Sequence, residues 1–517
     1  MSNLHQRPKQ EHAKLQRGQV MIILALAFIG LAAFIGLAVD AGILFIQIGH
    51  LRRAVDSASL AAASQFREGR PLSEIEAAAN EFIDLNSVSS ADASIFICDI
   101  SDPTTTNTNV YHDVTLCPPD EDGDGIYGPP ADPDDTTAPR KYVRVNGQLP
   151  VEFSFLPIIG FGSIDIKATA VSETASVDIV LVIDTSPSMT FDASCVDGDD
   201  DDGDGVDDDC DPVADPTLGG NGIPDNFMED PDNCNPTDDC HPFEEVRAAA
   251  LALVGRMYFP YDRMAVIGFD QNAVAQLDLS SDVVSIVSSI ASLSVYKLPG
   301  CPGWPDPSLC TSTNIADGLK VGGSQFGAFL REEAVLILIL LSDGAANTAT
   351  NDSPPPLRLC PSTGAGNPNW IPPFCRDTDF EVGTGAAGYD AEDAAVDQGY
   401  FVGCPEANSF DPTLTTCASP GQGAVVFTIG LGDQMTDNQN CDDAVYTAAQ
   451  CTDNEDQGEK LLRYIAAIGD DGDPSTDPCS STAKGNSCGN YYFAPVGADL
   501  LQVFEAIASR IFTRITQ

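Results

Sequence analysis

Apolar residues follow different patterns along the 517-residue chain, and the first pattern predicts a membrane segment. Residues 20–39 form an uninterrupted apolar run. At 1.5 Å per residue, a helix of this length measures about 30 Å, which is the thickness of a bilayer core. We therefore predict one transmembrane helix that continues into an alanine-rich segment, with small residues on one face suited to close packing on a neighbour. That face carries Leu51, Ala54, Ala58, Ala61 and Ala62.

The charges around this run predict its orientation. Arg7, Lys9, Lys14 and Arg17 precede the run and Asp40 follows it. The positive-inside rule then places residues 1–19 in the cytoplasm as a short tail and the bulk of the chain outside. The competing interpretation is a cleaved secretory signal, but its apolar core normally has only about 7–15 residues. No convincing small-residue cleavage site follows the run, so we favour the uncleaved anchor.

The next pattern, in residues 40–172, alternates between helical and strand periodicity. Residues 72–85 have helical spacing, whereas residues 141–145, 149–155 and 163–171 alternate with a period of two. We expect a long N-terminal helix followed by a small antiparallel sheet.

From residue 176 onward, apolar strands alternate with amphipathic helices, which indicates a parallel sheet covered on both faces. The predicted strands are residues 177–183, 263–269, 274–279, 334–341 and 424–431. The predicted helices are residues 243–257, 283–293, 315–326, 391–398, 459–468 and 498–515. Long polar insertions interrupt this α/β domain at about residues 190–242, 347–388, 401–422 and 433–457.

The charge of the chain narrows its possible partners. The net charge is −52, from 77 acidic and 25 basic residues. This balance argues against nucleic acid, because binding to phosphates requires a concentrated basic face. Much of the acidity is clustered in residues 120–135, 197–215 and 470–477. Such clusters are either cation sites or solvated acidic loops, and both interpretations remain open.

All sixteen cysteines lie beyond residue 97, in polar loops rich in proline and glycine. An even number of cysteines in such loops indicates disulfides and an oxidising compartment. The sequence does not fix the connectivity, but pairing of neighbours is the simplest arrangement. It gives Cys98/Cys117, Cys195/Cys210, Cys234/Cys240, Cys301/Cys310, Cys360/Cys375, Cys404/Cys417, Cys441/Cys451 and Cys479/Cys488. A zinc site would require short Cys-x-x-Cys or Cys/His ligand pairs, and the only histidine near a cysteine is His241, which follows Cys240.

Oxygen-bearing side chains cluster where the first strand of the α/β domain ends. Asp184, Ser186 and Ser188 follow the apolar residues 177–183. Each could simply serve a turn or cap a helix. Together they resemble the Asp-x-Ser-x-Ser segment of the metal-ion-dependent adhesion site in von Willebrand factor A domains. Thr313, at the start of a helix, and Asp343, at the end of an apolar strand, match the two remaining segments of that site.

The resemblance implies a Rossmann-like, doubly wound, mostly parallel sheet over residues 176–517. It also implies that these five residues hold Mg²⁺ or Mn²⁺, some directly and some through water. Magnesium has near-octahedral oxygen coordination and keeps some of its waters, so a position remains for a carboxylate oxygen from a protein partner.

The insertion at residues 200–211 contains a second candidate metal site. Its sequence resembles the calcium repeat of thrombospondin type 3, with Gly205 at the sharp turn of the loop. The candidate Ca²⁺ ligands are Asp200, Asp202, Asp204, Asp208 and Asp211.

Residues 17–64 resemble the N-terminal region of Tad (Flp) pilus-assembly proteins of the TadE/TadG type. A basic-Gly pair, an apolar span ending near Val39-Asp40 and an Ala/Asp-rich continuation occur together. The resemblance implies a bacterial membrane protein whose residues 40–172 form a pilin-like stalk. Its partners would be pilus or secretion-apparatus proteins.

We expect a binding protein rather than an enzyme, because the chain lacks zinc-protease and phosphate-loop motifs and has only five histidines. The leading hypothesis is an anchored pilus component with a metal-dependent adhesion domain. The alternatives are a pilus-independent surface adhesin and a structural scaffold with calcium-stiffened loops.

Overall fold

The structure is a computed structural model and describes most of the helices and strands together with the shorter loops. The described residues are 16–67, 72–86, 88, 93–98, 110–117, 140–190, 231–238, 240–296, 313–328, 331, 334–349, 380, 390–405, 417, 419–432, 435–436 and 456–514. They fall into two compact units: an N-terminal unit that ends at Thr174 and a C-terminal unit whose main part begins at Ala175.

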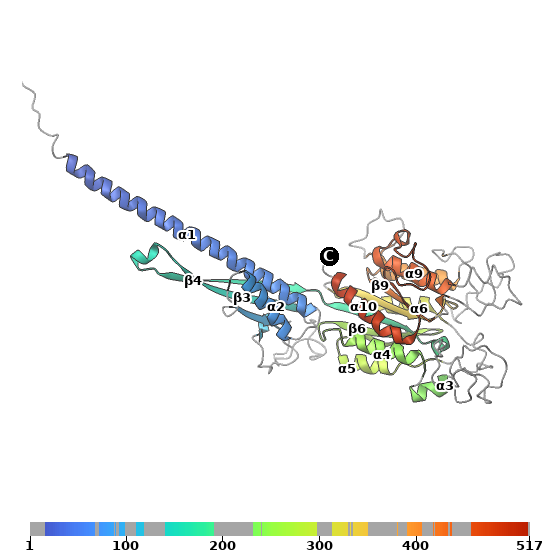
Figure 1. Cartoon of the computed structure of the whole chain (residues 1–517). Helices are drawn as coiled ribbons and strands as arrows, with labels where there is room; N and C mark the ends of the chain where they lie inside the picture. Colours follow the sequence, from blue (N-terminus) through green and yellow to red (C-terminus); the bar gives the residue numbers. More distant parts are fainter. Residues whose placement is uncertain are drawn as a thin grey trace, which may run out of the picture. The chain divides into compact units, whose positions relative to one another are not determined.

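The N-terminal unit combines a long helix with a four-stranded sheet (Figure 1). Its elements are α1 (Gln16–Arg67), α2 (Leu72–Leu85), β1 (Ala93–Ile97), β2 (Val110–His112), β3 (Lys141–Glu152) and β4 (Ser163–Thr174), with strand order β2-β1-β3-β4. Helix α1 contains a stretch that is long and apolar enough to cross a membrane, a test that a signal sequence also passes. The expected plan, a long helix followed by a small sheet, is confirmed, although β1 pairs with β2 in parallel.

The small-residue face of α1 packs on the sheet of its own unit. Leu51, Ala54 and Ala58 are fully buried. A Cβ added at Gly147 of β3 would lie 2.7 Å from Val55 Cγ1, and Ser59 Oγ lies 2.8 Å from Ser172 Oγ of β4. The expected close packing of this face is therefore observed, and the neighbour is the sheet of the same unit.

The separate strands predicted at 141–145 and 149–155 are one strand, β3. The Asn146-Gly147 pair, which is typical of a turn, here lies within the strand. The glycine lets β3 approach α1 closely. Pro150 is tolerated because β1 pairs with β3 only as far as residue 147, so Pro150 lies past the end of that pairing.

The C-terminal unit contains a six-stranded sheet with strand order β10-β9-β8-β5-β6-β7. The strands are β5 (Val177–Asp184), β6 (Arg263–Phe269), β7 (Ala273–Ser280), β8 (Val335–Ser342), β9 (Val425–Leu431) and β10 (Tyr491–Ala494). All pairs are parallel except β6 with β7, so β7 is an antiparallel edge strand. The sequence interpretation did not include β10, whose four residues are too few to show a period.

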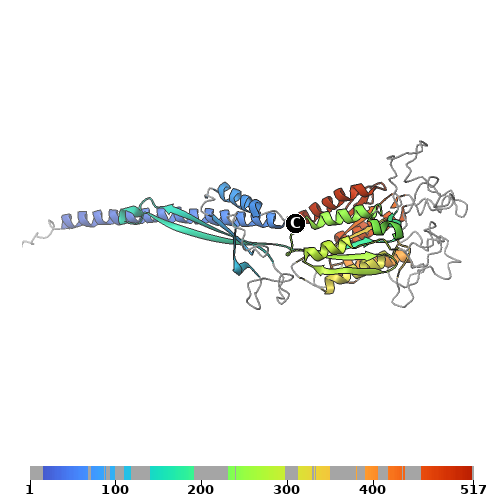
Figure 2. The same cartoon turned by 90° about the horizontal axis from the view of Figure 1, so that it is seen from below.

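Helices cover both faces of this sheet, as Figures 1 and 2 show. Ile179 and Leu181 of β5 belong to the core under α4 (Phe243–Val254), α5 (Val283–Ala291) and α10 (Leu500–Arg514). Val180 and Val182 belong to the core under α6 (Ile315–Ala328), α7 (Ala391–Gly403) and α9 (Gln457–Asp471). Successive side chains of a strand point to opposite faces, so a strand buried on both faces is apolar throughout. The α/β fold expected from the sequence is confirmed.

The described cysteines bear out half of the predicted pairing. Four disulfides are Cys98–Cys117, Cys234–Cys240, Cys404–Cys417 and Cys479–Cys488. The other four predicted pairs lie outside the described residues, as do most residues of the predicted insertions. One insertion boundary is wrong, because residues 401–403 belong to α7.

Candidate metal centre

The parallel strands bring the predicted ligands to one edge of the sheet. Asp184 is the last residue of β5, and Asp343 directly follows β8. Asp184 pairs in register with Phe269 of β6, and Ile183 pairs with Leu341 of β8. This edge is formed by the carboxyl ends of the strands, where doubly wound sheets bind their ligands.

Hydrogen bonds link four of the five predicted ligands into one group. Ser188 Oγ donates to Asp343 Oδ1 at 2.9 Å, and the hydroxyls of Ser186 and Ser188 lie 2.9 Å apart. The backbone N–H of Ser186 donates to Asp184 Oδ1 at 2.8 Å. Asp184, Ser186, Ser188 and Asp343, which we call the oxygen cluster, therefore meet although 155 residues separate Ser188 from Asp343.

Thr313 reaches the same edge through its backbone. Its N–H donates to Asn347 Oδ1 at 2.8 Å, and its carbonyl accepts from the N–H of Asn347 at 3.1 Å. The N–H of Asn314 donates to the carbonyl of Asp270 at 2.8 Å. The start of α6 is thus fastened between the loops that follow β8 and β6. The role of the Thr313 hydroxyl as a ligand stays a prediction.

Two further residues at this edge were not predicted. Ser342, the last residue of β8, donates its hydroxyl to Asp184 Oδ2 at 2.6 Å. Asp270 directly follows β6, and its charge raises the pKa of Asp184. The position of Asp270 at the end of an apolar strand is a signal that could have found it. Nothing in the sequence distinguishes Ser342 from an ordinary strand residue.

Burial changes the proton affinity of the carboxylates. Asp184 is fully buried, and Asp343 is 4% exposed. Loss of water raises the pKa of Asp184 from 3.8 to about 6, despite the hydrogen bonds from Ser342 and Ser186 that oppose the shift. Burial and the neighbouring Asp184 raise the pKa of Asp343 well above its usual range. Burial also raises the pKa of Asp270.

The oxygen cluster fits a small divalent cation. In the described part of the chain, the hydrogen bonds to Asp184 and Asp343 come from hydroxyl and backbone N–H groups, and the charges acting on these two carboxylates are those of other carboxylates. Two buried negative charges without a positive partner are costly. Carboxylate and hydroxyl oxygens are the ligands that Mg²⁺ prefers.

Of the two other candidate metal sites, the structure describes only the one formed by Cys98, His112 and Cys117. The proposed calcium ligands Asp200, Asp202, Asp204, Asp208 and Asp211 lie outside the described residues. Cys98, His112 and Cys117 lie close enough together to suggest a metal site. Their two sulfurs are joined in a disulfide, so they are not available as thiolate ligands.

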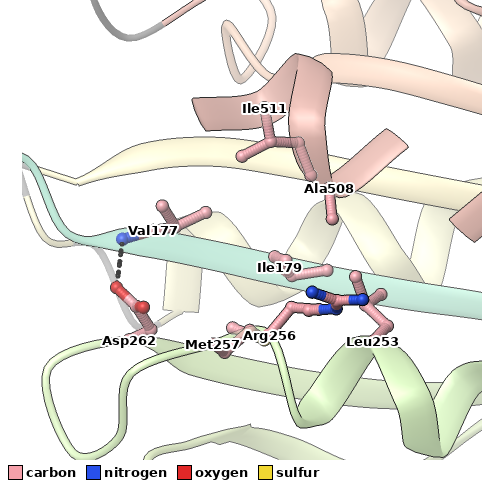
Figure 3. A pocket seen from close by; sticks show the side chains of 8 residues that line it. All are labelled: Val177, Ile179, Leu253, Arg256, Met257, Asp262, Ala508 and Ile511. Carbon is pink, nitrogen blue, oxygen red and sulfur yellow. Dashed lines mark hydrogen bonds between the residues drawn. The ribbon is translucent and has the colours of Figure 1, made fainter. Parts of the chain in front are cut away.

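A small pocket lies at the opposite end of β5 (Figure 3). Val177, the first residue of β5, donates its N–H to Asp262 Oδ1 at 3.0 Å, and Ile179 and Leu253 contribute apolar walls. This end of the sheet is formed by the amino ends of the strands, where ligand sites of such sheets are not found. We therefore interpret the pocket as a packing gap.

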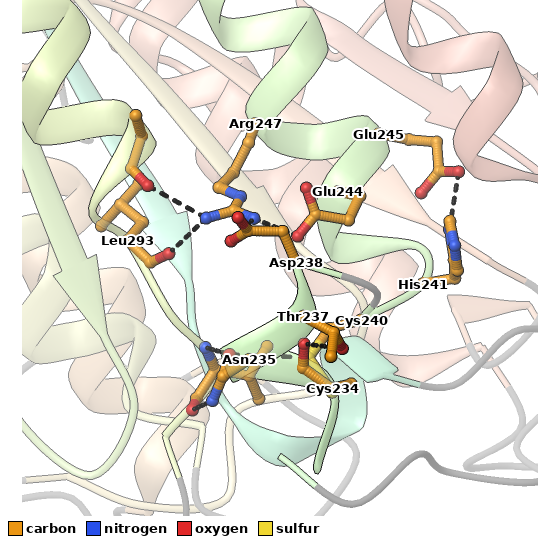
Figure 4. Close-up of polar contacts among 12 residues, drawn as sticks. Cys234, Asn235, Thr237, Asp238, Cys240, His241, Glu244, Glu245, Arg247 and Leu293 are labelled. Atoms are coloured by element: carbon orange, nitrogen blue, oxygen red, sulfur yellow. Dashed lines mark hydrogen bonds and ion pairs between the residues drawn. A yellow bond between two sulfur atoms is a disulfide. The ribbon is translucent and has the colours of Figure 1, made fainter. Parts of the chain in front are cut away.

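Figure 4 shows the contacts that hold the end of the first insertion. Asn235, next to the Cys234–Cys240 disulfide, donates its side-chain N–H to the Val295 carbonyl at 2.8 Å and accepts the Val295 N–H at 3.0 Å. The N–H of Tyr296 in turn donates to the carbonyl of Thr185 at 2.7 Å. Thr185 adjoins Asp184, so the insertion rejoins the fold beside the candidate centre.

Arg247 of α4 holds the same segment from its other side (Figure 4). It donates to Asp238 Oδ1 at 2.8 Å, to Glu244, and to the carbonyls of Ala291 and Leu293 at 3.0 and 3.1 Å. The guanidinium thereby joins the insertion to both α4 and the end of α5.

No protein-family model and no curated protein sequence matches the chain. Solved structures with a similar fold include the von Willebrand factor domain of the type V pili tip protein Mfa5 from Porphyromonas gingivalis. It is 14% identical, with 67% of this chain and 98% of that chain covered and a TM-score of 0.34. The PilB minor pilin from Streptococcus sanguinis is 12% identical, with coverage of 73% and 76% and a TM-score of 0.33.

A third similar structure is proximal thread matrix protein 1 from the mussel byssus, described as having a zinc-occupied MIDAS motif. It is 13% identical with a TM-score of 0.29, and the match covers 66% of this chain but only 46% of that chain. Because these TM-scores are low, the fold assignment rests on the strand order, the antiparallel edge strand β7 and the position of Asp184 at the end of β5. These features give the C-terminal unit the doubly wound α/β fold that its resemblance to von Willebrand factor A domains implies.

Proposed function

We propose that this protein is a membrane-anchored component of a bacterial Tad/Flp pilus or a related secretion system, and that its extracytoplasmic C-terminal unit binds a protein partner through a divalent metal. The main support for metal-dependent binding is the oxygen cluster. In it, two buried carboxylates and two hydroxyls meet at the edge of the sheet formed by the carboxyl ends of the strands.

Asp184, Ser186, Ser188, Thr313 and Asp343 would hold Mg²⁺ or Mn²⁺. The cation would compensate the buried negative charge and offer a position to a carboxylate oxygen of the partner. Ser342 orients Asp184 through its 2.6 Å hydrogen bond. We assign the protein a binding role and not a catalytic one.

The anchor and its orientation rest on the sequence. The apolar stretch of α1 would span the membrane once, with residues 1–19 in the cytoplasm and the remainder outside. The disulfides agree with an oxidising extracytoplasmic compartment. In the same proposal, Asp200, Asp202, Asp204, Asp208 and Asp211 bind Ca²⁺ and stiffen the first insertion.

Titration of the metal-stripped full chain in detergent tests the metal site. Mg²⁺ or Mn²⁺ should give saturable heat in calorimetry and raise the melting temperature, because a ligand at one hundred times its Kd stabilises a fold by about 2.7 kcal/mol. Asp184→Ala should abolish both responses. The control Glu505→Ala removes a carboxylate whose side chain is 50% exposed and pairs with Arg256. It should respond like the parent chain.

A response to metal in Asp184→Ala equal to that of the parent would refute the site. Cross-linking on intact cells then tests partner binding. A partner captured by the parent and not by a folded Asp184→Ala chain supports adhesion, whereas equal capture favours a scaffold. Normal surface function after deletion of the pilus secretion ATPase would contradict the pilus role.

A further inference from the structure

The hairpin that joins β3 to β4 ends in an exposed apolar tip. Residues 155–162 read Phe-Leu-Pro-Ile-Ile-Gly-Phe-Gly, with no polar side chain among them. The exposed fractions are 83% for Ile158, 69% for Ile159, 64% for Phe161 and 45% for Phe155. A contiguous apolar patch of this kind on a protein surface marks a contact with a membrane or another protein.

The tip lies beside the apolar stretch of α1. A Cβ added at Gly36 would lie 3.0 Å from Cβ and Cγ of Phe155, so the ring of Phe155 packs directly on the helix backbone. Gly36 lies within residues 20–39, where the side chains are otherwise exposed. Figures 1 and 2 show β3 and β4 running along α1 toward its N-terminal end. The hairpin therefore reaches the segment that is predicted to lie in lipid.

Asp40 fastens the tip to the helix. Its carboxylate is fully buried and accepts three backbone N–H groups, from Ser154 at 2.8 Å, Phe155 at 3.0 Å and Leu156 at 2.7 Å. Backbone N–H groups near the hydrocarbon of a bilayer need a partner within the protein, because water is scarce there. Asp40 supplies that partner at the first turns of the hairpin loop.

Polar residues mark where the apolar tip ends. Glu152, the last residue of β3, and Asp165 on β4 are exposed. Carboxylates belong in water or among headgroups, whereas the only polar side chains between these two residues are the hydroxyls of Ser154 and Ser163. The boundary between the polar and the apolar part of the hairpin thus lies near the turn of α1 that carries Asp40. The apolar stretch of α1 ends at the same turn.

We propose that the β3–β4 tip is a second membrane-binding element, whose Phe155, Ile158, Ile159 and Phe161 insert into the outer leaflet of the bilayer that α1 spans. The inference rests on the proposed anchor. Lipid is the occupant because the tip is continuous with the exposed apolar surface of residues 20–39, and because Asp40 satisfies the backbone at that depth. A second copy of the chain is the competing occupant.

Cysteine substitution with an environment-sensitive fluorophore tests the proposal on the full chain in phospholipid nanodiscs. Ile158→Cys places the dye at the tip. The matched control is Val171→Cys, which is 53% exposed on β4 and pairs with Arg144, away from the tip. Acyl-chain spin-labelled phosphatidylcholine should quench the dye at 158 and not at 171. Iodide should quench the dye at 158 roughly tenfold less than at 171, because ions are excluded from hydrocarbon.

Equal iodide quenching at the two positions would overturn the proposal. Protection at 158 that disappears when each nanodisc holds a single chain would also overturn it and identify a second copy as the occupant. Ile159→Cys provides an independent position if Ile158→Cys does not fold.

The test also separates this inference from the proposed anchor. Chains that resist carbonate extraction but have a water-exposed position 158 contradict the tip insertion alone. Chains that are released by carbonate contradict the anchor itself. Asp40→Asn should increase iodide quenching at 158 and leave the chain in the membrane.

Discussion

At the scale of single residues, the candidate centre is defined by carboxylates that are expensive to bury. Asp184 has lost all contact with solvent, and its pKa rises to about 6 mainly for that reason. A group whose pKa is higher in the folded than in the unfolded chain makes folding take up protons. In the metal-free protein, Asp184 therefore destabilises the fold when it is ionised.

We predict that the metal-free parent gains stability relative to Asp184→Asn when the pH falls from about 7 to about 4. The folded pKa of about 6 lies above the ordinary value of 3.8, so the stability falls as the pH rises through this window and is flat above it. A shift of this size corresponds to about 3 kcal/mol. Denaturant unfolding of both chains at several pH values measures how the stability difference changes with pH. The comparison with the Asn variant cancels the distant acidic groups but includes the response of Asp343, because the charge of Asp184 contributes to the raised pKa of Asp343.

A difference between the two chains that does not change with pH would contradict this prediction. In excess Mg²⁺ the dependence should reverse, since the cation binds only the ionised carboxylates and competes with protons.

The residues that sequence reasoning found at the site were those with a local signature. Asp184, Ser186 and Ser188 are close together in the chain, and Asp343 ends an apolar run. Ser342 escaped detection because its role depends on the register between β5 and β8, which no local pattern reveals. Asp270 escaped because one aspartate after a strand is also an ordinary turn residue.

At the scale of elements, the packing of α9 on the sheet depends on one glycine. A Cβ added at Gly469 would lie 2.3 Å from Val426 Cβ and 2.6 Å from the Val426 backbone nitrogen in β9. The helix could not keep its position, because a backbone atom cannot move aside as the end of a flexible side chain can.

We predict that Gly469→Ala lowers the free energy of unfolding by about 2 kcal/mol or more, in the range of other overpacked cores. The control Gly327→Ala in α6 meets only the end of Gln422, at 3.7 Å, and should be neutral or stabilising by up to about 1 kcal/mol. Equal stability of the two variants in urea unfolding would show that α9 does not pack on β9 in this way.

The elements that could be predicted were the long ones with a clear period. Strand β5 and helix α6 appear close to their expected positions because apolar residues dominate one or both faces. Strand β10 has four residues, and β2 has three. Such strands exist because a neighbouring strand offers free hydrogen bonds, a condition that is set by the tertiary fold.

At the scale of the whole molecule, the C-terminal unit has a complete core of its own. Both faces of its sheet are covered by helices from the same unit. We predict that a fragment of residues 175–517, secreted into an oxidising compartment, folds and shows the same Mg²⁺-dependent rise in melting temperature as the full chain. Circular dichroism and calorimetry measure both properties.

Replacing Cys404 and Cys417 together by serine should lower the stability of this fragment without unfolding its sheet. Cys404–Cys417 spans 13 residues and joins segments beside α7 and α9. Loss of such a cross-link costs about 3 kcal/mol by the entropy of loop closure. A fragment that aggregates under oxidising conditions would contradict an independent core.

The connection between the two units has a mechanical consequence. Strand β4 ends at Thr174 and β5 begins at Val177, so only two residues separate them. Under the proposed function, a partner bound at Asp184 and pulling against the proposed anchor would apply tension along the length of β5. Strand β5 forms parallel pairs with β6 on one side and β8 on the other. The load therefore shears all the hydrogen bonds of both pairs together and does not break them one after another. Because the proposed binding site lies at the carboxyl end of β5 and the connection to β4 lies at its amino end, β5 is the strand that would transmit this load.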